Sequence, residues 1–261
     1  IIDTGATLSL AFENLARDQK FTLANEPPRR ILGLNSQQET DVITIGDIAV
    51  GEERLANHVG VVLADWDAPR RTPQGIIGLD FLERYLVVFD RDARTISFYD
   101  PQGAPPAALE RWRQSELVRR VFVEGLGALY TTRATVNGKK VSFILDLGAS
   151  GTLINFAALR QILSGVRVNP TGSANTGSRL SDITGDETTA RLVLAQTLRI
   201  GGMRWVRALL LVYNAEIFNE LRVRSQPYGL LGADIMTQRS FAINFNDEKL
   251  YIKNERPRKT R

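Results

Sequence analysis

Cysteine is absent from this 261-residue sequence, and histidine occurs only once. The missing thiols exclude disulfide bonds, thiol catalysis and thiolate metal sites. No run of about 18 apolar residues is present, so the sequence predicts no membrane-spanning helix. His58 has no second histidine with which to hold a metal ion, and we expect it to be a surface or structural residue. These absences favour a chemistry that needs neither a thiol nor a metal.

The composition is that of a globular protein, with 43% hydrophobic and 24% charged residues. The net charge of +4 comes largely from basic residues near 111–120 and from the tail after residue 253, which we expect to be solvated. No basic stretch is interleaved with aromatic residues, so we expect no nucleic-acid partner. We also expect no metal or cofactor, because the acidic residues that could suit Ca²⁺ are not spaced as a calcium loop. These are Asp65, Asp67, Asp182, Asp186 and Glu187.

The chain begins with a motif that returns near its middle. Two apolar residues lead into Asp3-Thr4-Gly5-Ala6, and an apolar strand-like run leads into Asp146-Leu147-Gly148-Ala149. In each copy a carboxylate ends an apolar segment, and the glycine two residues later permits a sharp turn. A single such motif is most simply a turn, whereas two copies in one chain are stronger evidence of a site.

Other landmarks repeat in the same order. Residues 48–51 match 198–201 at an offset of 150, and residues 75–82 match 229–236 at an offset of 154. Because the landmarks keep their order, the chain is predicted to hold two copies of one domain. We expect a first lobe over residues 1–100, a linker over 101–118, a second lobe over 119–253 and a basic tail over 254–261.

These motifs resemble the aspartic proteases, and specifically their retropepsin-like branch. The resemblance is carried by Asp3-Thr4-Gly5-Ala6 and by the apolar-apolar-glycine turns that end at Gly78 and Gly232, and it covers nearly the whole chain. It implies an all-β fold of two tandem β-barrel lobes related by a pseudo-two-fold axis, with a few short helices. The second loop departs from the family pattern, because Leu147 stands where a hydroxyl residue is usual.

The resemblance also implies a function. Asp3 and Asp146 would form a catalytic pair that activates water to hydrolyse a peptide bond, in a monomer whose two lobes pair within one chain. Supporting roles fall to loop residues, which are Thr4, Gly5, Ala6, Leu147, Gly148 and Ala149. The substrate would be a peptide or protein in extended conformation.

Two alternatives stay open at this stage. One is a weak or inactive relative that binds extended peptides between its lobes, which the departure at Leu147 keeps in view. The other is a site built from the first halves of two molecules.

A flap that closes over the substrate is expected at residues 31–40, where Gly33 marks a bend before a polar tip. The residues predicted to bind substrate there are Ile31, Gly33, Asn35, Ser36 and Gln37. The polar stretch 169–189 is the second choice for a flap.

Local patterns predict several further elements. Asn137-Gly138 predicts the turn of a hairpin over residues 130–146, and a second hairpin is expected over 86–99. Helices are expected over 12–18, 81–85, 107–120, 157–163 and 215–224. Asp80 and Asp234 are interpreted as helix caps rather than catalytic groups.

The two copies differ in the sequence that precedes the aspartate. About 25 residues of strand-like sequence precede Asp146, from Arg120 to Leu145, whereas only Ile1 and Ile2 precede Asp3. We therefore expect the sequence to be a fragment or processed form. The family resemblance suggests a bacterial protein with an extracytoplasmic location, periplasmic or membrane-associated.

Overall fold

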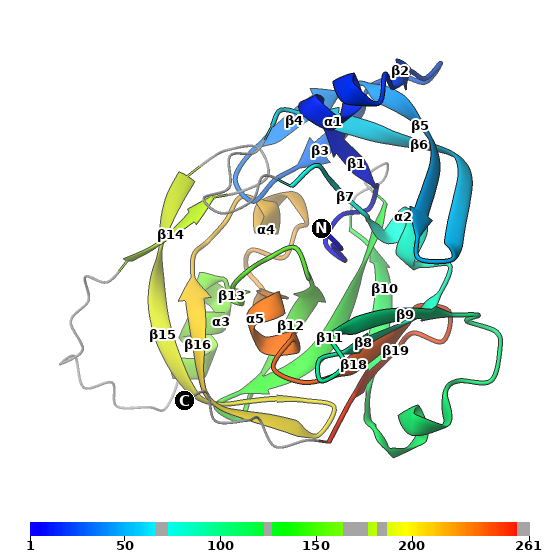
Figure 1. Cartoon of the computed structure of the whole chain (residues 1–261). Helices are drawn as coiled ribbons and strands as arrows, with labels where there is room; N and C mark the ends of the chain where they lie inside the picture. The colour runs from blue at the N-terminus through cyan, green and yellow to red at the C-terminus, as the bar shows by residue number, and fades with distance from the viewer. Residues whose placement is uncertain (66–72, 123–126, 164–176, 182–186, 255–261) are drawn as a thin grey trace.

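The computed structural model describes residues 1–65, 73–122, 127–163, 177–181 and 187–254 of the chain (Figure 1). Most of these residues lie in strands, and the helices are short, so the all-β prediction is confirmed. The expected basic tail, most of the second candidate flap and three of the acidic residues considered for Ca²⁺ lie outside the described residues. Within the described part, no helix is long and apolar enough to cross a membrane.

The first half forms a sheet of five strands in the order β2-β5-β6-β1-β7. Its central contact is a parallel pairing of β1 with β6, in which Leu10 lies opposite Val61. The elements of this half are β1 (Leu10–Phe12), α1 (Glu13–Asp18), β2 (Thr22–Leu23), β3 (Arg29–Leu32), β4 (Gln37–Thr40), β5 (Val42–Val50), β6 (Glu53–Leu63), β7 (Gly75–Ile76), α2 (Leu79–Leu82), β8 (Leu86–Asp90) and β9 (Thr95–Tyr99).

The second half repeats this arrangement within a larger sheet of twelve strands, to which the first half contributes β8 and β9. Its β13 pairs in parallel with β16, and Leu153 lies opposite Leu211 as Leu10 lies opposite Val61 in the first half. The elements are η1 (Ala107–Arg111), β10 (Arg113–Val121), β11 (Ala128–Val136), β12 (Lys139–Leu145), β13 (Leu153–Ile154), α3 (Phe156–Leu163), β14 (Gly177–Ser181), β15 (Glu187–Ile200), β16 (Met203–Val212), α4 (Ile217–Glu220), β17 (Tyr228–Leu231), α5 (Ala233–Met236), β18 (Phe241–Asn244) and β19 (Lys249–Ile252).

The two halves are joined by a symmetric strand pairing. Strands β8 and β18 pair antiparallel, with Val87 opposite Ile243 and Phe89 opposite Phe241. Because the sequence repeat maps residue 87 onto 241 and 89 onto 243, these two pairs are images of each other. A contact between like surfaces in which each partner plays both roles is what a two-fold axis requires. The axis passes at the pair of Val88 with Ala242, and the two phenylalanine rings stack with their centroids 4.5 Å apart.

Apolar packing continues across this junction. The largest buried cluster takes Leu79 and Phe81 from the first half and Phe143 and Trp205 from the second. Removing such apolar surface from water contributes roughly 25 cal/mol per Å² to folding. The halves therefore share one core, and the first half keeps a smaller cluster of its own around Phe12.

Two expectations of local structure are confirmed. The hairpin of β11 and β12 turns at Asn137 and Gly138, both of which have positive φ, as a two-residue turn of this kind requires. The hairpin of β8 and β9 lies where it was predicted.

The expected helix over residues 107–120 is wrong beyond its first turn. Only residues 107–111 are helical, and β10 follows from Arg113 to Val121. Strand β10 pairs with β19 along one part and with β11 along the other, so sheet pairing overrides a local sequence without strong strand signals. It also crosses the expected boundary between linker and second lobe; the domain boundaries themselves stay a prediction.

The interpretation of two carboxylates as helix caps is also wrong. The N-cap residues of α2 and α5 are Gly78 and Gly232, and neither helix has a side-chain cap hydrogen bond. Asp80 and Asp234 lie inside these helices. Their carboxylates accept hydrogen bonds from the hydroxyls of Ser9 and Thr152, as described below.

Candidate active site

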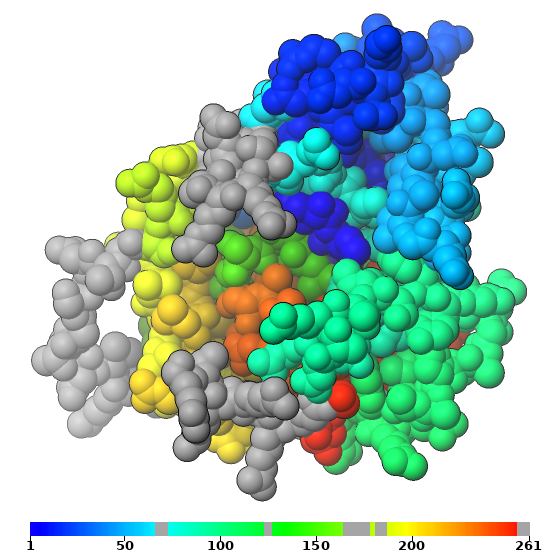
Figure 2. Space-filling model, in the orientation of Figure 1, coloured from blue at the N-terminus to red at the C-terminus, as the bar shows by residue number. Residues whose placement is uncertain are grey.

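The two aspartates occupy equivalent positions in the backbone. The amide of Asp3 donates to the carbonyl of Ile77 at 3.0 Å, and the amide of Asp146 donates to the carbonyl of Leu231 at 3.1 Å. Each aspartate thus follows a strand segment that runs parallel to the apolar-glycine segment of its own half. Figure 2 shows the dark blue N-terminal residues adjoining green atoms of the second half, with orange atoms of that half next to the green.

Each loop packs its glycine against the aspartate of the other loop. A Cβ atom added to Gly5 would lie 2.7 Å from Oδ1 of Asp146, and one added to Gly148 would collide with the carboxylate of Asp3. Real Cβ contacts are not this short, so a side chain at either position would displace the opposite carboxylate. The amide of Gly148 also donates across the junction to Oδ1 of Asp3 at 3.1 Å.

The paired carboxyl groups hold a proton more tightly than isolated ones. Burial, together with the neighbouring charge of Asp3, raises the pKa of Asp146 to about 8. Burial also raises the pKa of Asp3, although the amides of Gly5 and Gly148 oppose this by donating to its Oδ1. The two side chains are hydrogen-bonded to each other, and two buried carboxyl groups this close do not readily ionise together. Asp3 accepts from two amides and Asp146 accepts from that of Ala149 at 3.0 Å, so the negative charge is favoured on Asp3 and the proton on the fully buried Asp146.

Thr4 ties the two loops together from the first half. Its buried hydroxyl donates to the carbonyl of Leu145 at 2.9 Å and accepts from the amide of Leu147 at 3.1 Å. Leu147 has no hydroxyl to return these bonds, and it packs instead against the large apolar cluster. Cross-loop bonding through a side-chain hydroxyl therefore comes from the first half alone.

A second set of hydrogen bonds joins each aspartate loop to the apolar-glycine segment of its own half. In the first half the amide of Leu79 donates to the carbonyl of Ala6, and the amide of Gly78 donates to the hydroxyl of Ser9. That hydroxyl donates in turn to Oδ1 of Asp80 at 2.7 Å. We call this set, Ser9 with Gly78 and Asp80, the hydroxyl clasp of the first half.

The second half has the same clasp, formed by Thr152, Gly232 and Asp234. The hydroxyl of Thr152 donates to Oδ1 of Asp234 at 2.6 Å and accepts from the amide of Gly232 at 3.1 Å. The amide of Ala233 donates to the carbonyl of Ala149 at 2.8 Å. Sequence reasoning missed both clasps, although a hydroxyl residue six positions after each aspartate was a usable signal.

The candidate flap over residues 31–40 is a two-stranded hairpin of β3 and β4. Gly33 donates to the carbonyl of Ser36 at its turn, and the carbonyl of Leu34 accepts from the amide of Ile217 at 3.0 Å. The tip therefore rests on the loop that carries α4 in the second half. The hairpin prediction holds, and the roles in substrate binding of Ile31, Gly33, Asn35, Ser36 and Gln37 stay a prediction.

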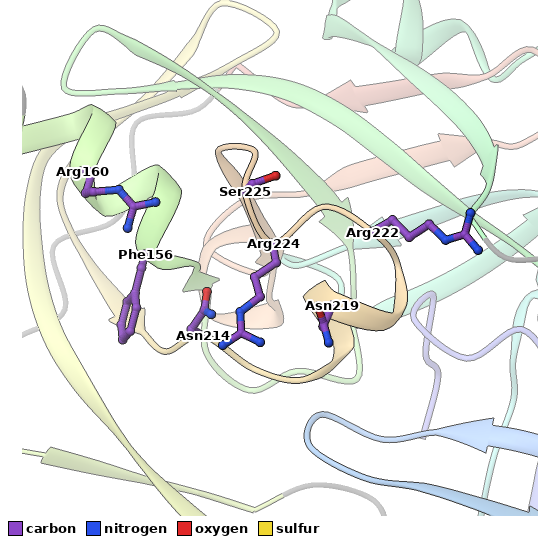
Figure 3. A pocket seen from close by; sticks show the side chains of 7 residues that line it. All are labelled: Phe156, Arg160, Asn214, Asn219, Arg222, Arg224 and Ser225. Carbon is purple, nitrogen blue, oxygen red and sulfur yellow. The ribbon is translucent and has the colours of Figure 1, made fainter.

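A cationic hollow of about 580 Å³ lies between α3 and the loop of α4 (Figure 3). In Figure 3 the side chain of Arg224 lies beside that of Asn214, Arg160 lies above Phe156 in the view, and Arg222 points away from them. The full lining is Phe156, Arg160, Asn214, Asn219, Arg222, Arg224 and Ser225. The lining includes no carboxylate; Glu216 lies nearby, 3.9 Å from Arg224.

The wall of this hollow is held in place by a buried amide. The side chain of Asn155 donates to the carbonyl of Val223 at 3.2 Å and to that of Gln226 at 2.8 Å. Among the described residues, no group of three or more acidic or histidine side chains is arranged to hold a metal ion.

Comparison with known proteins identifies the family. A family model described as aspartyl protease matches residues 1–81 and 132–235, which is most of the chain in two separate segments. The chain is also similar to a solved retropepsin-like aspartic protease from Rickettsia conorii, at 15% identity and a TM-score of 0.31, over 53% of this chain and 92% of that one. Among curated proteins, none matches. Because that model matches most of the chain, the chain belongs to the aspartyl protease family.

Proposed function

We propose that the protein is an aspartic endopeptidase whose single active site takes Asp3 from the first half and Asp146 from the second. The observation that carries the proposal is the interlocking of the two loops. Each glycine, Gly5 or Gly148, packs on the opposite carboxylate, so the two acids are held against each other. Two carboxyl groups that share one proton supply a base and an acid at the same place.

The proposed reaction follows from the position of that proton. The Asp3 carboxylate takes a proton from a water molecule, whose oxygen then bonds to the carbonyl carbon of the peptide. Protonated Asp146 donates a hydrogen bond to the carbonyl oxygen and stabilises its developing negative charge. When the tetrahedral intermediate collapses, the C–N bond breaks and the amide nitrogen takes the proton that Asp3 acquired. The products are a carboxylic acid and an amine.

An extended peptide is the substrate class that the surroundings of the pair favour. The β3–β4 hairpin presents strand edges near the junction of the halves, and an extended chain can bind such edges through its backbone. Its docking on the second half through Leu34 supports a role in closing the site. A monomer suffices for this arrangement, because both aspartates come from one chain.

Incubation with an unfolded protein at acid pH, with products identified by mass spectrometry, tests the proposal. We expect internal peptide bonds to be cleaved by the wild type and not by a folded Asp3→Asn variant. A peptide with a secondary hydroxyl in place of the scissile carbonyl should inhibit, because it mimics the tetrahedral intermediate. Tight binding of peptides without any cleavage would instead support the peptide-binding alternative.

The site built from two molecules makes a different prediction. If the first halves of two chains supplied both aspartates, activity would rise with dimer formation and would not need Asp146. Solution mass measured alongside activity separates the cases, and we expect full specific activity at concentrations where the protein is a monomer.

A further inference from the structure

One carboxylate of the two hydroxyl clasps has a further side-chain partner. In the first half Nε2 of His58 lies 2.9 Å from Oδ2 of Asp80, the oxygen that also accepts from the amide of Ser9 at 2.6 Å. Both side chains of this pair are largely shielded from solvent, at 11% and 14% exposure. His58 therefore completes the bonding of the Asp80 carboxylate.

In the second half, the position equivalent to His58 is not a histidine. Strand β6 pairs with β1 as β16 pairs with β13. This register makes residue 208 of the second half equivalent to residue 58 of the first. Residue 208 is a buried alanine, so no imidazole reaches Asp234 from this position. The chain thus carries an internal comparison of one clasp with histidine and one without.

The electrostatics of the two carboxylates differ accordingly. Burial acts to raise the pKa of both Asp80 and Asp234. Hydrogen bonds from His58 and Ser9 outweigh burial at Asp80 and lower its pKa, whereas the bonds from Thr152 leave the pKa of Asp234 raised. The first clasp is consequently held by an ionised carboxylate.

We propose that His58 is a positioning residue for the loop that carries Asp3, acting through Asp80 and Ser9; the proposal rests on the proposed peptidase function. The path is short and continuous. His58 contacts Asp80, Asp80 holds Ser9, the Ser9 hydroxyl fixes the amide of Gly78, and the next residue donates to the carbonyl of Ala6 in the aspartate loop.

The contact is strongest when the imidazole is charged. Histidine gains its charge in the range in which acid peptidases work, and a charge-assisted hydrogen bond is about twice as strong as a neutral one. Within the described residues, Asp80 is the one acidic group within ion-pair distance of the His58 ring. Asp47 of the neighbouring strand β5 accepts from the backbone amide of Asn57, the residue before His58, at 3.4 Å.

The test measures kcat and KM from pH 4 to 8 for the wild type, His58→Ala and His58→Gln. Alanine is the residue at the equivalent position of the second half, and glutamine keeps a neutral donor. At pH 5 we expect His58→Ala to lower kcat about tenfold with KM changed less than twofold, because loop geometry and not substrate contact is altered. The kcat of His58→Gln should match that of the wild type at pH 8 and be lower than that of the wild type at pH 5.

A matched control separates positioning from general destabilisation. Val59→Ala alters the neighbouring residue of β6 and should lower stability without changing the pH dependence of kcat. The proposal is overturned if the ratio of wild-type kcat to His58→Gln kcat is the same at every pH. It is also overturned if kcat is unchanged in His58→Ala.

A second readout does not depend on catalysis. Amide hydrogen exchange at Ser9 and Gly78, measured by NMR in the full chain at one pH, should be at least tenfold faster in His58→Ala than in the wild type. Faster exchange in a protein that cleaves nothing would support the clasp and refute the peptidase function. Equal exchange would refute the clasp whatever the activity.

Discussion

Replacing Thr4 by valine removes one hydroxyl while keeping the shape of the side chain. The carbonyl of Leu145 and the amide of Leu147 then both lose their partner in the cross-loop bond. A buried polar group left without a hydrogen bond costs about 1–3 kcal/mol. Because the Leu147 amide is only partly buried, we expect the free energy of unfolding to fall by about 2–4 kcal/mol in all.

The effect on catalysis should be similar in free energy to that on folding. The two bonds set the distance between the aspartate loops, and a small misplacement of catalytic groups can lower a rate about 100-fold. We expect kcat of Thr4→Val to fall by about that factor, and Thr4→Leu, which adds bulk at a fully buried position, to be nearly inactive. Unfolding in urea followed by tryptophan fluorescence, with kcat on one peptide, gives both quantities.

Thr4→Ser is the matched control, because it keeps the hydroxyl and loses only a methyl group. It should retain most of the activity and lose about 1 kcal/mol or less of stability. If Thr4→Val keeps the full kcat of the wild type, the cross-loop bond does not hold this site together. Equal losses in the serine and valine variants would assign the role to packing of the methyl group.

Three further predictions concern the same pair and its surroundings. Leu147→Thr restores a hydroxyl that can return the cross-loop bond to the carbonyl of Ile2, and kcat on one peptide should rise up to about tenfold. Because the pKa of Asp146 is raised from 3.8 to about 8, the folded state binds its proton more tightly than the unfolded state, so this group lowers stability progressively as pH rises through that window. Urea unfolding from pH 4 to 8 should show a flatter stability curve for Asp146→Asn, the wild-type slope approaching about 1.4 kcal/mol per pH unit. Peptides with glutamate should bind better than their glutamine counterparts through the cationic hollow, and Arg160→Gln with Arg224→Gln should remove that preference in fluorescence titrations.

The repeat made much of this fold predictable. Matching landmarks around Asp3 and Asp146 predicted two copies of a β domain, and the register of β8 against β18 follows the same offset. The helix expected after residue 107 failed because β10 has strand partners on two sides that no local pattern reveals. Propensity describes a segment alone, whereas a sheet is decided by distant strands.

The candidate site was predictable in part for the same reason. The loop residues themselves repeat in the sequence, and the structure brings both aspartates together. The residues that support these loops are not contiguous in the sequence. Ser9 and Asp80 are 71 positions apart, and the residue equivalent to His58 in the second half is an alanine. A lone histidine gives no pattern to detect, and its contact with Asp80 emerges only when β6 is paired with β1.

The central claim is that one carboxylate from each half forms a single catalytic pair within one chain. The most direct test is kcat/KM for the wild type, Asp3→Asn and Asp146→Asn on one peptide at acid pH, with folding of each variant checked by circular dichroism. We predict that both variants lose at least about 1,000-fold, and that mixing them restores nothing, because each molecule then lacks one member of its own pair. Near-normal turnover by folded Asp146→Asn, with activity lost only in Asp3→Asn, would contradict the account.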